Sequence, residues 1–317
     1  MDEEFNIITK IGEGGFGTAY KAIHKPTGTI VTLKSIDSKN SKDFERLKSI
    51  QSPNVITVFD SFINNKTKTQ YIAYPYIEFE LGKFLKNVDQ SFFSIPVIAY
   101  LSEEILQGIK IIHSNNIAHL DLKPGNIFLT NKWEVKIGDL GSSQPFSKQS
   151  DKPIAYTCQY AAPEILSGSK EITPKIDIFC FGLILYEMLT HENLILASTP
   201  KNALRSLRTT LGKNADVFLY QKITTESVFG STQENCKIAI DFLKNLLKLN
   251  PGERPSAEEA LEHPFIALAA KKEDLEMIPI SENYENSCQV KLLTEEIDKI
   301  RPKPLHPKSI VVRTPSW

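Results

Sequence analysis

The sequence predicts an α+β protein in which a small β-rich lobe is followed by a larger helical lobe. Up to about residue 77, short stretches rich in β-branched and aromatic residues alternate with glycine or proline turns, as strands do. From about residue 84 onward, apolar residues recur at three- and four-residue spacings, which is typical of amphipathic helices. The 317 residues are 41% apolar and 24% charged, enough to bury a core in one large domain or in two lobes. Strands that precede helices rather than alternate with them indicate the α+β class.

The small lobe is expected to consist mainly of strands. Glycine and proline turns separate the first three strands, and Ser52-Pro53-Asn54 ends a helical patch that follows them. The expected elements are strands at 5–8, 17–22 and 29–34, a helix at about 41–50, and strands at about 55–62 and 70–77.

The large lobe is expected to be helical. Its expected elements are helices at 95–113, 175–189 and 238–249 and one buried strand at 127–129. The longest apolar run, 176–189, is interrupted by Asp177 and Glu187 and is shorter than the roughly 20 residues that a bilayer span needs. We therefore interpret this run as a buried helix.

The composition becomes polar after about Ala270, which divides the chain into a folded domain and a tail. We place the domain at 1–268, with the small lobe at about 1–77 and the large lobe at about 78–268, and the tail at 269–317.

Within the tail, Val290, Leu293, Ile297 and Ile300 fall on one face of a helix. The segment 290–300 is therefore expected to dock on the domain or to bind a partner. A mostly disordered tail is the alternative, because the tail as a whole contains many prolines, lysines and serines.

Charge and cysteine usage restrict the partners and the compartment. The net charge of −1 gives no basic field for nucleic acid or anionic lipid, so we expect neither as a partner. The acidic start of the chain does not resemble a signal peptide. The four cysteines are scattered, without a metal-ligand spacing, and are expected to be reduced: Cys158, Cys180, Cys236 and Cys288. These features predict an intracellular protein, cytoplasmic or nuclear, without a membrane anchor.

A glycine-rich segment and a lysine predict a nucleotide site. The run 12–17 fits G-x-G-x-x-G, and strand-like residues follow it rather than a helix. This order favours a hairpin laid over a nucleotide, since backbone without Cβ atoms can approach phosphate oxygens closely. Lys34 ends the next strand, 17 residues beyond Gly17, and is expected to hold the α- and β-phosphates of ATP.

The segment 119–126, His-Leu-Asp-Leu-Lys-Pro-Gly-Asn, predicts phosphoryl transfer. Asp121 can accept the proton of a substrate hydroxyl, and Lys123 can neutralise charge that builds on the transferred group. Asn126 and Asp139, which follows a predicted strand, supply oxygen ligands of the kind that Mg²⁺ or Mn²⁺ prefers.

From about Phe5 to Phe265 the chain resembles a eukaryotic-type protein kinase of the serine/threonine type. The resemblance implies the bilobal protein-kinase fold, ATP and Mg²⁺ as cofactors, and a protein substrate. Further matching residues are Ala162-Pro163-Glu164 at the end of the activation segment, Asp177 and Gly182 in a buried helix, Arg254 as the partner of Glu164, and His263-Pro264-Phe265 at the end of the fold.

The resemblance also implies a nucleotide pocket. Ala19, Thr32 and Phe128 would enclose the adenine, Tyr74 would be the gatekeeper, and the backbone of Pro75 and Ile77 would form the hinge. The full set of expected ATP-binding residues is Ile11, Gly12, Glu13, Gly14, Gly15, Phe16, Gly17, Ala19, Thr32, Lys34, Tyr74, Pro75, Tyr76, Ile77 and Phe128.

Two positions depart from the family pattern. Leu120 stands where the family carries an arginine that binds an activation-loop phosphate, so we expect activity without phosphorylation of this loop. Asp43 occupies the position of the glutamate that pairs with Lys34, and Glu45 lies two residues later. Two residues turn a helix by about 200°, so both cannot face the lysine. We expect Asp43 to be the catalytic partner, with Glu45 as the alternative.

The kind of kinase is less sharply defined. Lys123 and Thr157 resemble the serine/threonine pattern, whereas the catalytic loop is also similar to those of Wee/Myt-type and Mos-type kinases. A Wee/Myt-like dual-specificity enzyme acting on cell-cycle kinases, a pseudokinase scaffold and a small-molecule kinase are the alternatives. Candidate phosphorylation sites are Ser142, Ser143, Ser147, Ser150 and Thr157.

Overall fold

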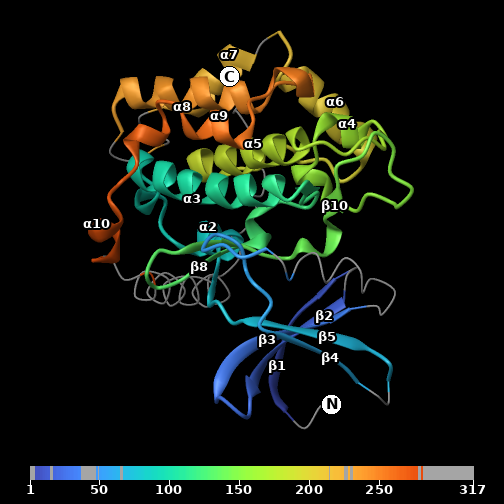
Figure 1. Cartoon of the computed structure of the whole chain (residues 1–317). Helices are drawn as coiled ribbons and strands as arrows, with labels where there is room; N and C mark the ends of the chain where they lie inside the picture. Colours follow the sequence, from blue (N-terminus) through green and yellow to red (C-terminus); the bar gives the residue numbers. More distant parts are fainter. Residues whose placement is uncertain are drawn as a thin grey trace, which may run out of the picture.

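A computed structural model describes residues 4–14, 17–36, 48, 50–64, 67–213, 215–224, 228, 231–277 and 280. In this part of the chain a β-sheet lobe and a larger helical lobe lie next to each other, which confirms the predicted α+β bilobal fold (Figure 1). Several expectations lie outside the described residues: Gly15, Phe16, Asp43, Glu45, Cys288 and the segment 290–300.

The small lobe is an antiparallel sheet of five strands in the order β1-β2-β3-β5-β4. The strands are β1 (Phe5–Gly14), β2 (Gly17–His24), β3 (Thr29–Ile36), β4 (Asp60–Ile63) and β5 (Gln70–Pro75). Val31 and Leu33 of β3 are buried in the small-lobe core. Because successive side chains alternate across a sheet, Thr32 and Lys34 point to the opposite face. The sheet thereby presents these two residues to the interior of the cleft, which they line.

The strand predicted at 55–62 is shorter than expected. Val55 forms a parallel bridge with Ile137, and the Ile56 amide donates to the Ile137 carbonyl oxygen at 2.8 Å. The backbone of this segment is therefore bonded to the large lobe, and β4 begins only at Asp60. Of the helix predicted at 41–50, the structure describes only Lys48 and Ile50.

Helices build the large lobe and stack in layers (Figure 1). They are α2 (Leu81–Asn87), α3 (Ile95–Ser114), α4 (Pro163–Leu166), α5 (Lys175–Thr190), α6 (Pro200–Thr210), α7 (Ala215–Lys222), α8 (Gln233–Leu246), α9 (Ala257–Leu261) and α10 (Lys272–Glu276). The predictions for α3 and α5 are confirmed to within a residue at each end. Helix α8 begins and ends earlier than predicted. It begins earlier because Thr232 caps its start by accepting from the Asn235 amide at 3.1 Å.

Helix α5 is the centre of the large-lobe core, as its apolar run predicts. Its residues from Ile176 to Leu189 are buried on all sides. A Cβ at Gly182 would lie 2.7 Å from a methyl group of Leu247, so the glycine lets the end of α8 pack closely. Within the described ranges, no helix combines the length and the apolarity required to cross a membrane.

Two small sheets place the functional loops between the lobes. Strands β6 (Phe79–Glu80), β8 (Ile127–Leu129) and β9 (Val135–Ile137) form one, in the order β6-β8-β9. Strands β7 (Ile117–Ala118) and β10 (Gln144–Pro145) form the other. The loop 119–126 therefore lies between β7 and β8. The loop after β9 lies beside it, since the Gly138 amide donates to the Asn126 carbonyl oxygen at 2.8 Å.

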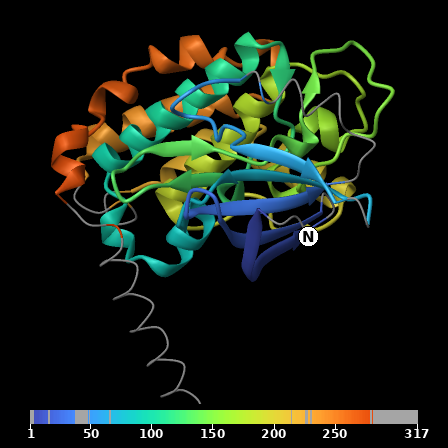
Figure 2. The same ribbon diagram turned by 60° about the horizontal axis from the view of Figure 1, so that its bottom comes forward.

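The packed part of the chain extends beyond the predicted start of the tail. The Ala270 amide donates to the Pro96 carbonyl oxygen at 2.9 Å, and Leu275 of α10 and Ile280 are buried in the large-lobe core. The domain boundary at 268 stays a prediction. Viewed from the small lobe, the strands lie in front of the large-lobe helices (Figure 2).

Candidate active site

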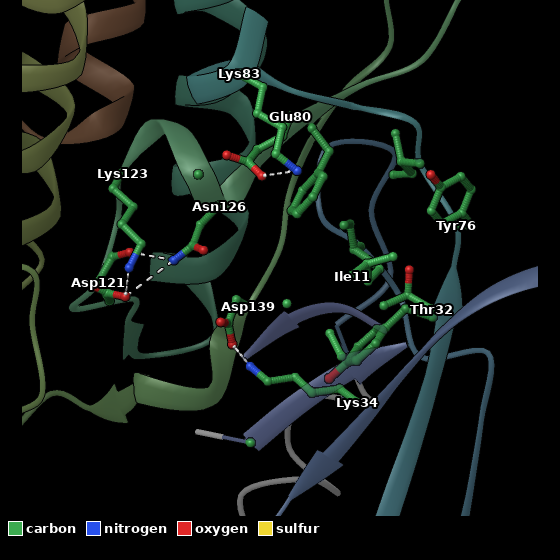
Figure 3. Close-up of a pocket in the computed structure, with 18 of the residues that line it drawn as sticks. Ile11, Thr32, Lys34, Tyr76, Glu80, Lys83, Asp121, Lys123, Asn126 and Asp139 are labelled. Carbon is green, nitrogen blue, oxygen red and sulfur yellow. Dashed lines mark hydrogen bonds and ion pairs between the residues drawn. The ribbon is translucent and has the colours of Figure 1, made fainter. Parts of the chain in front are cut away.

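A cleft of about 800 Å³ separates the two lobes and contains the predicted site residues (Figure 3). This volume lies in the range of small-molecule sites, roughly 300–1,000 Å³. The sequence-predicted residues that line it are Ile11, Gly12, Glu13, Gly17, Ala19, Thr32, Lys34, Tyr74, Pro75, Tyr76, Ile77, Asp121, Lys123, Asn126, Phe128 and Asp139. Gly14 is the last residue of β1. The motifs, far apart in sequence, thus meet around one cavity.

The glycine-rich hairpin, which forms the roof of the cleft, is hydrogen-bonded to the strand that carries Lys34. Gly17 has a φ of +121°, and a Cβ there would lie 1.7 Å from the Ser35 carbonyl oxygen, so only glycine fits. The Thr18 amide donates to Ser35 Oγ at 2.9 Å, and this hydroxyl donates to the Thr18 carbonyl oxygen at 3.2 Å. Ser35 thereby adds two bonds to the β2–β3 ladder at the point where the hairpin begins.

Lys34 and Asp139 form an ion pair across the cleft (Figure 3). Burial acts to raise the pKa of the Asp139 carboxyl, but the neighbouring Lys34 ammonium outweighs it, and the pKa lies below its usual value. Asp139 is therefore a carboxylate near neutral pH. Its backbone is left-handed, with a φ of 54°, a conformation that aspartate tolerates better than most residues.

The catalytic loop brings together Asp121, Lys123 and Asn126. Lys123 Nζ lies 2.7 Å from Asp121 Oδ2, and Asn126 Nδ2 donates to the Asp121 carbonyl oxygen at 2.8 Å. Since the amide nitrogen of Asn126 is engaged by this bond, its Oδ1 remains as the oxygen donor at the cleft. Asn126 and Asp139 thus offer the hard oxygen donors that suit Mg²⁺.

Asp177 of α5 fixes the backbone conformation at the start of the catalytic loop. Its side chain, 0% exposed, accepts from the amides of His119 at 2.8 Å and Leu120 at 3.0 Å, and it lies 2.8 Å from His113 Nε2. Burial acts to raise the pKa of this carboxyl, and the hydrogen bonds and charges of the two histidines lower it more. These bonds hold Leu120 at a φ of +69°, which is strained for a residue with a side chain.

The activation segment contributes Thr157 to the catalytic loop. Thr157 Oγ1 donates to Asp121 Oδ1 at 2.6 Å and accepts from Lys123 Nζ at 2.8 Å. A hydroxyl group is thus held between a carboxylate and an ammonium group. The sequence indicates Thr157 as a candidate phosphorylation site and as part of the serine/threonine pattern, but it does not indicate the contact with Asp121.

The predicted pair of Glu164 and Arg254 is present. Two parallel bonds of 2.7 and 2.9 Å join the guanidinium to the carboxylate, and Arg254 Nε donates to the Lys248 carbonyl oxygen at 2.7 Å. The pair anchors the end of the activation segment to the loop before α9. Bidentate geometry of this kind is specific to arginine.

Two tyrosines lie in the segment expected to form the gatekeeper and the hinge. Burial raises the pKa of Tyr74, so its hydroxyl stays neutral. Lys21 of β2 lies over the ring of Tyr76, with Nζ 4.2 Å from the ring centroid, a cation–π contact that joins the roof to the hinge.

Several residues of the cleft lining were not predicted from the sequence. They are Ile56, Glu78, Glu80, Lys83, Gly125, Ala155, Tyr156 and Thr157. Glu80 and Lys83 form an ion pair of 3.4 Å at the start of α2 (Figure 3). Their three-residue spacing is the one signal that could have linked them to each other, but nothing in the sequence indicates that α2 starts at the cleft.

Several cysteines and candidate phosphorylation sites are buried. Cys158, Cys180 and Cys236 are free, and burial raises the pKa of each thiol, in line with the expected reduced cysteines. Of the candidate phosphorylation sites, Ser142, Ser143 and Ser150 are buried.

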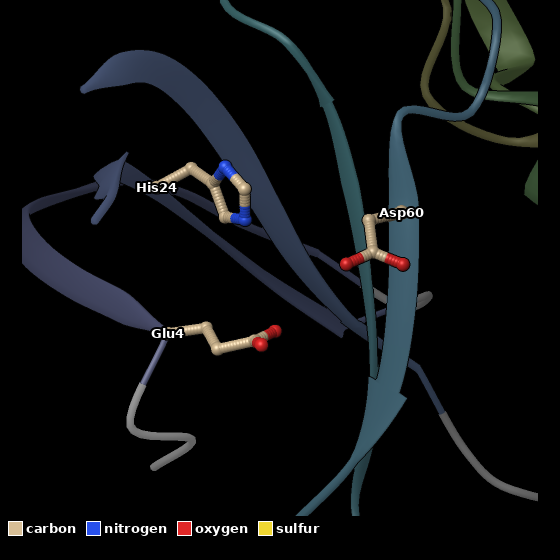
Figure 4. Close-up of side chains that lie close together, drawn as sticks. All are labelled: Glu4, His24 and Asp60. Carbon is tan, nitrogen blue, oxygen red and sulfur yellow. The ribbon is translucent and has the colours of Figure 1, made fainter. Parts of the chain in front are cut away.

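A second cluster lies on the small lobe, away from the cleft. Acceptor atoms of Glu4, His24 and Asp60 lie within 4.8 Å of one another (Figure 4). The His24 ring packs against Phe5 and Phe59, with centroids 5.0 and 5.2 Å apart, and these contacts account for its placement. Exposed carboxylates beside a histidine are common without a metal, and we assign the cluster no metal-binding role.

The bilobal fold and this cleft define a protein kinase. Comparison with known families agrees, because residues 5–266 match the family described as protein kinase domain. The chain therefore belongs to the protein kinase family.

Three curated proteins illustrate its similarity within this family. A "Probable cyclin-dependent serine/threonine-protein kinase" of Dictyostelium discoideum is 30% identical over 286 residues, 84% of this chain and 44% of that protein. Serine/threonine-protein kinase ppk23 of Schizosaccharomyces pombe is 28% identical over 302 residues, 87% of this chain and 76% of its own length. "Probable serine/threonine-protein kinase glkA" of Dictyostelium discoideum is 30% identical over 281 residues, 83% of this chain and 58% of its own length. The chain thus spans about half the length of two of these relatives.

Proposed function

We propose that this chain is an ATP-dependent protein kinase that transfers the γ-phosphate of ATP to serine or threonine hydroxyls of protein substrates. The observation that carries the proposal is the position of the Thr157 hydroxyl between Asp121 and Lys123, at 2.6 and 2.8 Å. An aliphatic hydroxyl already occupies hydrogen-bonding distance of both groups. The same two groups can therefore receive the hydroxyl of an incoming serine or threonine.

In this proposal Asp121 accepts the proton of the substrate hydroxyl as the oxygen attacks phosphorus. Lys123, 2.7 Å from Asp121, carries a positive charge toward the transferred phosphoryl group and orients the carboxylate. A base positioned in this way contributes roughly 10²- to 10⁴-fold to the rate.

Lys34, Asn126 and Asp139 would hold the nucleotide and its metal. When bound, Mg²⁺ supplies positive charge beside the phosphate oxygens. Asn126 and Asp139 offer their oxygens for it, and Lys34 places an ammonium at the edge of the same site, where the α- and β-phosphates would lie. All three line the cleft, which favours an enzyme over a pseudokinase scaffold.

Serine/threonine specificity is favoured over a Wee/Myt-like dual specificity by two observations. The three relatives carry serine/threonine kinase names. Lys123 and Thr157, which resemble the serine/threonine pattern, are bonded to each other at 2.8 Å beside Asp121.

The test is phosphorylation of a degenerate peptide array with Mg²⁺ and labelled ATP, followed by phosphoamino-acid analysis. We expect label on serine and threonine, and a loss of at least about 100-fold in kcat for Asp121→Asn. Asp151→Asn, a change at an exposed carboxylate of the activation segment, is the matched control and should retain activity. Label on tyrosine alone, or binding of Mg²⁺–ATP without transfer, would contradict the proposal.

A further inference from the structure

The first half of the activation segment is bonded to the large lobe through its backbone. Strand β10 pairs with β7. Beyond it, Ser147 and Ile172 exchange two amide–carbonyl bonds of 3.0 and 2.7 Å, and the Ser150 amide donates to the Lys170 carbonyl oxygen at 2.8 Å. These bonds fix the path of the chain as far as Ser150.

From Ser150 onward, hydrogen bonds of a side chain hold the segment in place. Gln144 Oε1 accepts from the Ser150 hydroxyl at 2.7 Å, and Gln144 Nε2 donates to the Pro153 carbonyl oxygen at 3.1 Å. A carbonyl can only accept, so the Pro153 bond sets the orientation of the glutamine amide. Gln144 and Ser150 are 8% and 7% exposed. We name these three residues the Gln144 bridge.

The Gln144 bridge lies just before the residues that reach the cleft. Ala155, Tyr156 and Thr157 begin two residues after Pro153 in the chain and line the cavity. Thr157 then binds Asp121 and Lys123. The bridge thereby closes a loop between Gln144 and Pro153, which are nine positions apart, and fixes the point from which the chain turns toward the catalytic base.

The Gln144 bridge also takes the place of the arginine that the family carries at the position of Leu120. Leu120, 2% exposed, is packed in the large-lobe core and offers no charge to the segment. The bonds of the Gln144 bridge are formed between neutral groups. They need no phosphate to form, and a charge placed among them would lose solvation and replace bonds between neutral groups.

We propose that Gln144 is a positioning residue of this kinase, which holds the activation segment in its substrate-binding conformation through neutral hydrogen bonds to Ser150 and Pro153. The inference rests on the proposed function and extends it to the control of the segment. A negative charge at Ser150 then inactivates the enzyme, opposite to the effect of a phosphate in a segment that an arginine stabilises.

The test compares Gln144→Met with Gln149→Met. Methionine keeps the length of glutamine and removes both hydrogen bonds, and Gln149 is an exposed glutamine of the same segment. Loss of a buried hydrogen-bonding partner should raise KM for a peptide substrate about tenfold in Gln144→Met. KM for ATP and the thermal shift produced by Mg²⁺–ATP should not change, because the bridge does not contact the nucleotide site.

Hydrogen exchange measures the same effect without relying on activity. In Gln144→Met the amides of residues 150–157 should exchange faster than in the unaltered chain, while those of α3 and α5 stay equally protected. If the unaltered chain transfers no phosphate, the proposed function fails, and the exchange rates still decide the role of Gln144. Equal exchange in Gln144→Met and Gln149→Met would overturn the proposal.

The second arm introduces a charge. Ser150→Asp should lower kcat/KM for the peptide by about tenfold or more, because a carboxylate would be buried among neutral groups. Ser150→Thr keeps the hydroxyl and should retain most of the activity. A Ser150→Asp enzyme more active than the unaltered chain would contradict the inactivating role of this charge.

Discussion

At the scale of single residues, small polar side chains determine how the phosphate-binding loops are held. Ser35 is an example, because its hydroxyl binds both the amide and the carbonyl of Thr18 at the base of the glycine-rich hairpin. The residue follows Lys34 directly, so one strand carries both the cation proposed to bind phosphate and the anchor of the glycine-rich hairpin.

Ser35→Ala is expected to weaken ATP binding. The change frees the Thr18 backbone from two bonds, each worth about 0.5–1.5 kcal/mol, so KM for ATP should rise about threefold to tenfold while kcat changes little. Steady-state kinetics at varied ATP concentration checks this. Ser35→Thr, which keeps the hydroxyl, is the control, and an unchanged KM for ATP in Ser35→Ala would show that the roof does not depend on this anchor.

Asp177 gives a residue-scale prediction that depends on pH. Its folded-state pKa is lowered from 3.8, so its contribution to stability is present above about pH 4 and is lost as the pH falls through the lower folded value. Asp177→Asn should therefore be destabilised by about 2–5 kcal/mol near neutral pH, since buried amides lose a charged acceptor.

Urea unfolding of both proteins between pH 7 and the lowest pH at which the unaltered chain stays folded measures this difference. The gap between the two free energies of unfolding should be constant down to about pH 4 and then narrow. If the difference between the two free energies of unfolding widened in acid, another carboxyl would determine the pH dependence of stability.

At the scale of elements, the activation segment is a strip attached at both ends. Strand β10 and the Gln144 bridge hold its beginning, and the Glu164–Arg254 pair holds its end. Thr157 lies between these attachments and joins the strip to the catalytic loop. Weakening either attachment should therefore reach Asp121 indirectly, through Thr157.

Arg254→Lys is expected to destabilise the large lobe even though the charge is kept. A lysine cannot form the two parallel bonds to Glu164 or reach the Lys248 carbonyl oxygen from the same position, and Arg254 is buried. We expect a loss of about 2–4 kcal/mol in the free energy of unfolding. Arg208→Lys, at an exposed arginine of α6, should change it by less than about 0.5 kcal/mol. Equal midpoints in urea for both variants would contradict the structural role of Arg254.

At the scale of the whole molecule, two lobes close on one cleft, and the Lys34–Asp139 ion pair joins them. The bilobal fold could be predicted from the sequence because each motif is local, whereas the contact between Lys34 and Asp139 was not predicted. The glycine-rich run, the lysine at the end of a strand, and the loop 119–126 each define a short backbone geometry and a chemical role within a few residues.

The parts that could not be predicted depend on contacts between distant segments. Thr157 and Asp121 are 36 residues apart, and no periodicity links them. The segment 55–62 has the composition of a strand, yet its first residues are bonded to Ile137 of the other lobe. Glu80 and Lys83 reach the cleft only because β6 pairs with β8. Local pattern determines the type of an element, whereas packing determines which of its residues face the cavity.

The burial of Leu120 has a consequence for how such an enzyme could change during evolution. An arginine at this position would carry a guanidinium into the apolar core, with no phosphate to meet it as long as Gln144 keeps Ser150 in a neutral bond. Replacing Gln144 alone would loosen the segment without supplying a new anchor. We therefore expect each single substitution to weaken the enzyme and the effects of the two substitutions to be non-additive. Mutational scanning of positions 120 and 144 together would measure this coupling.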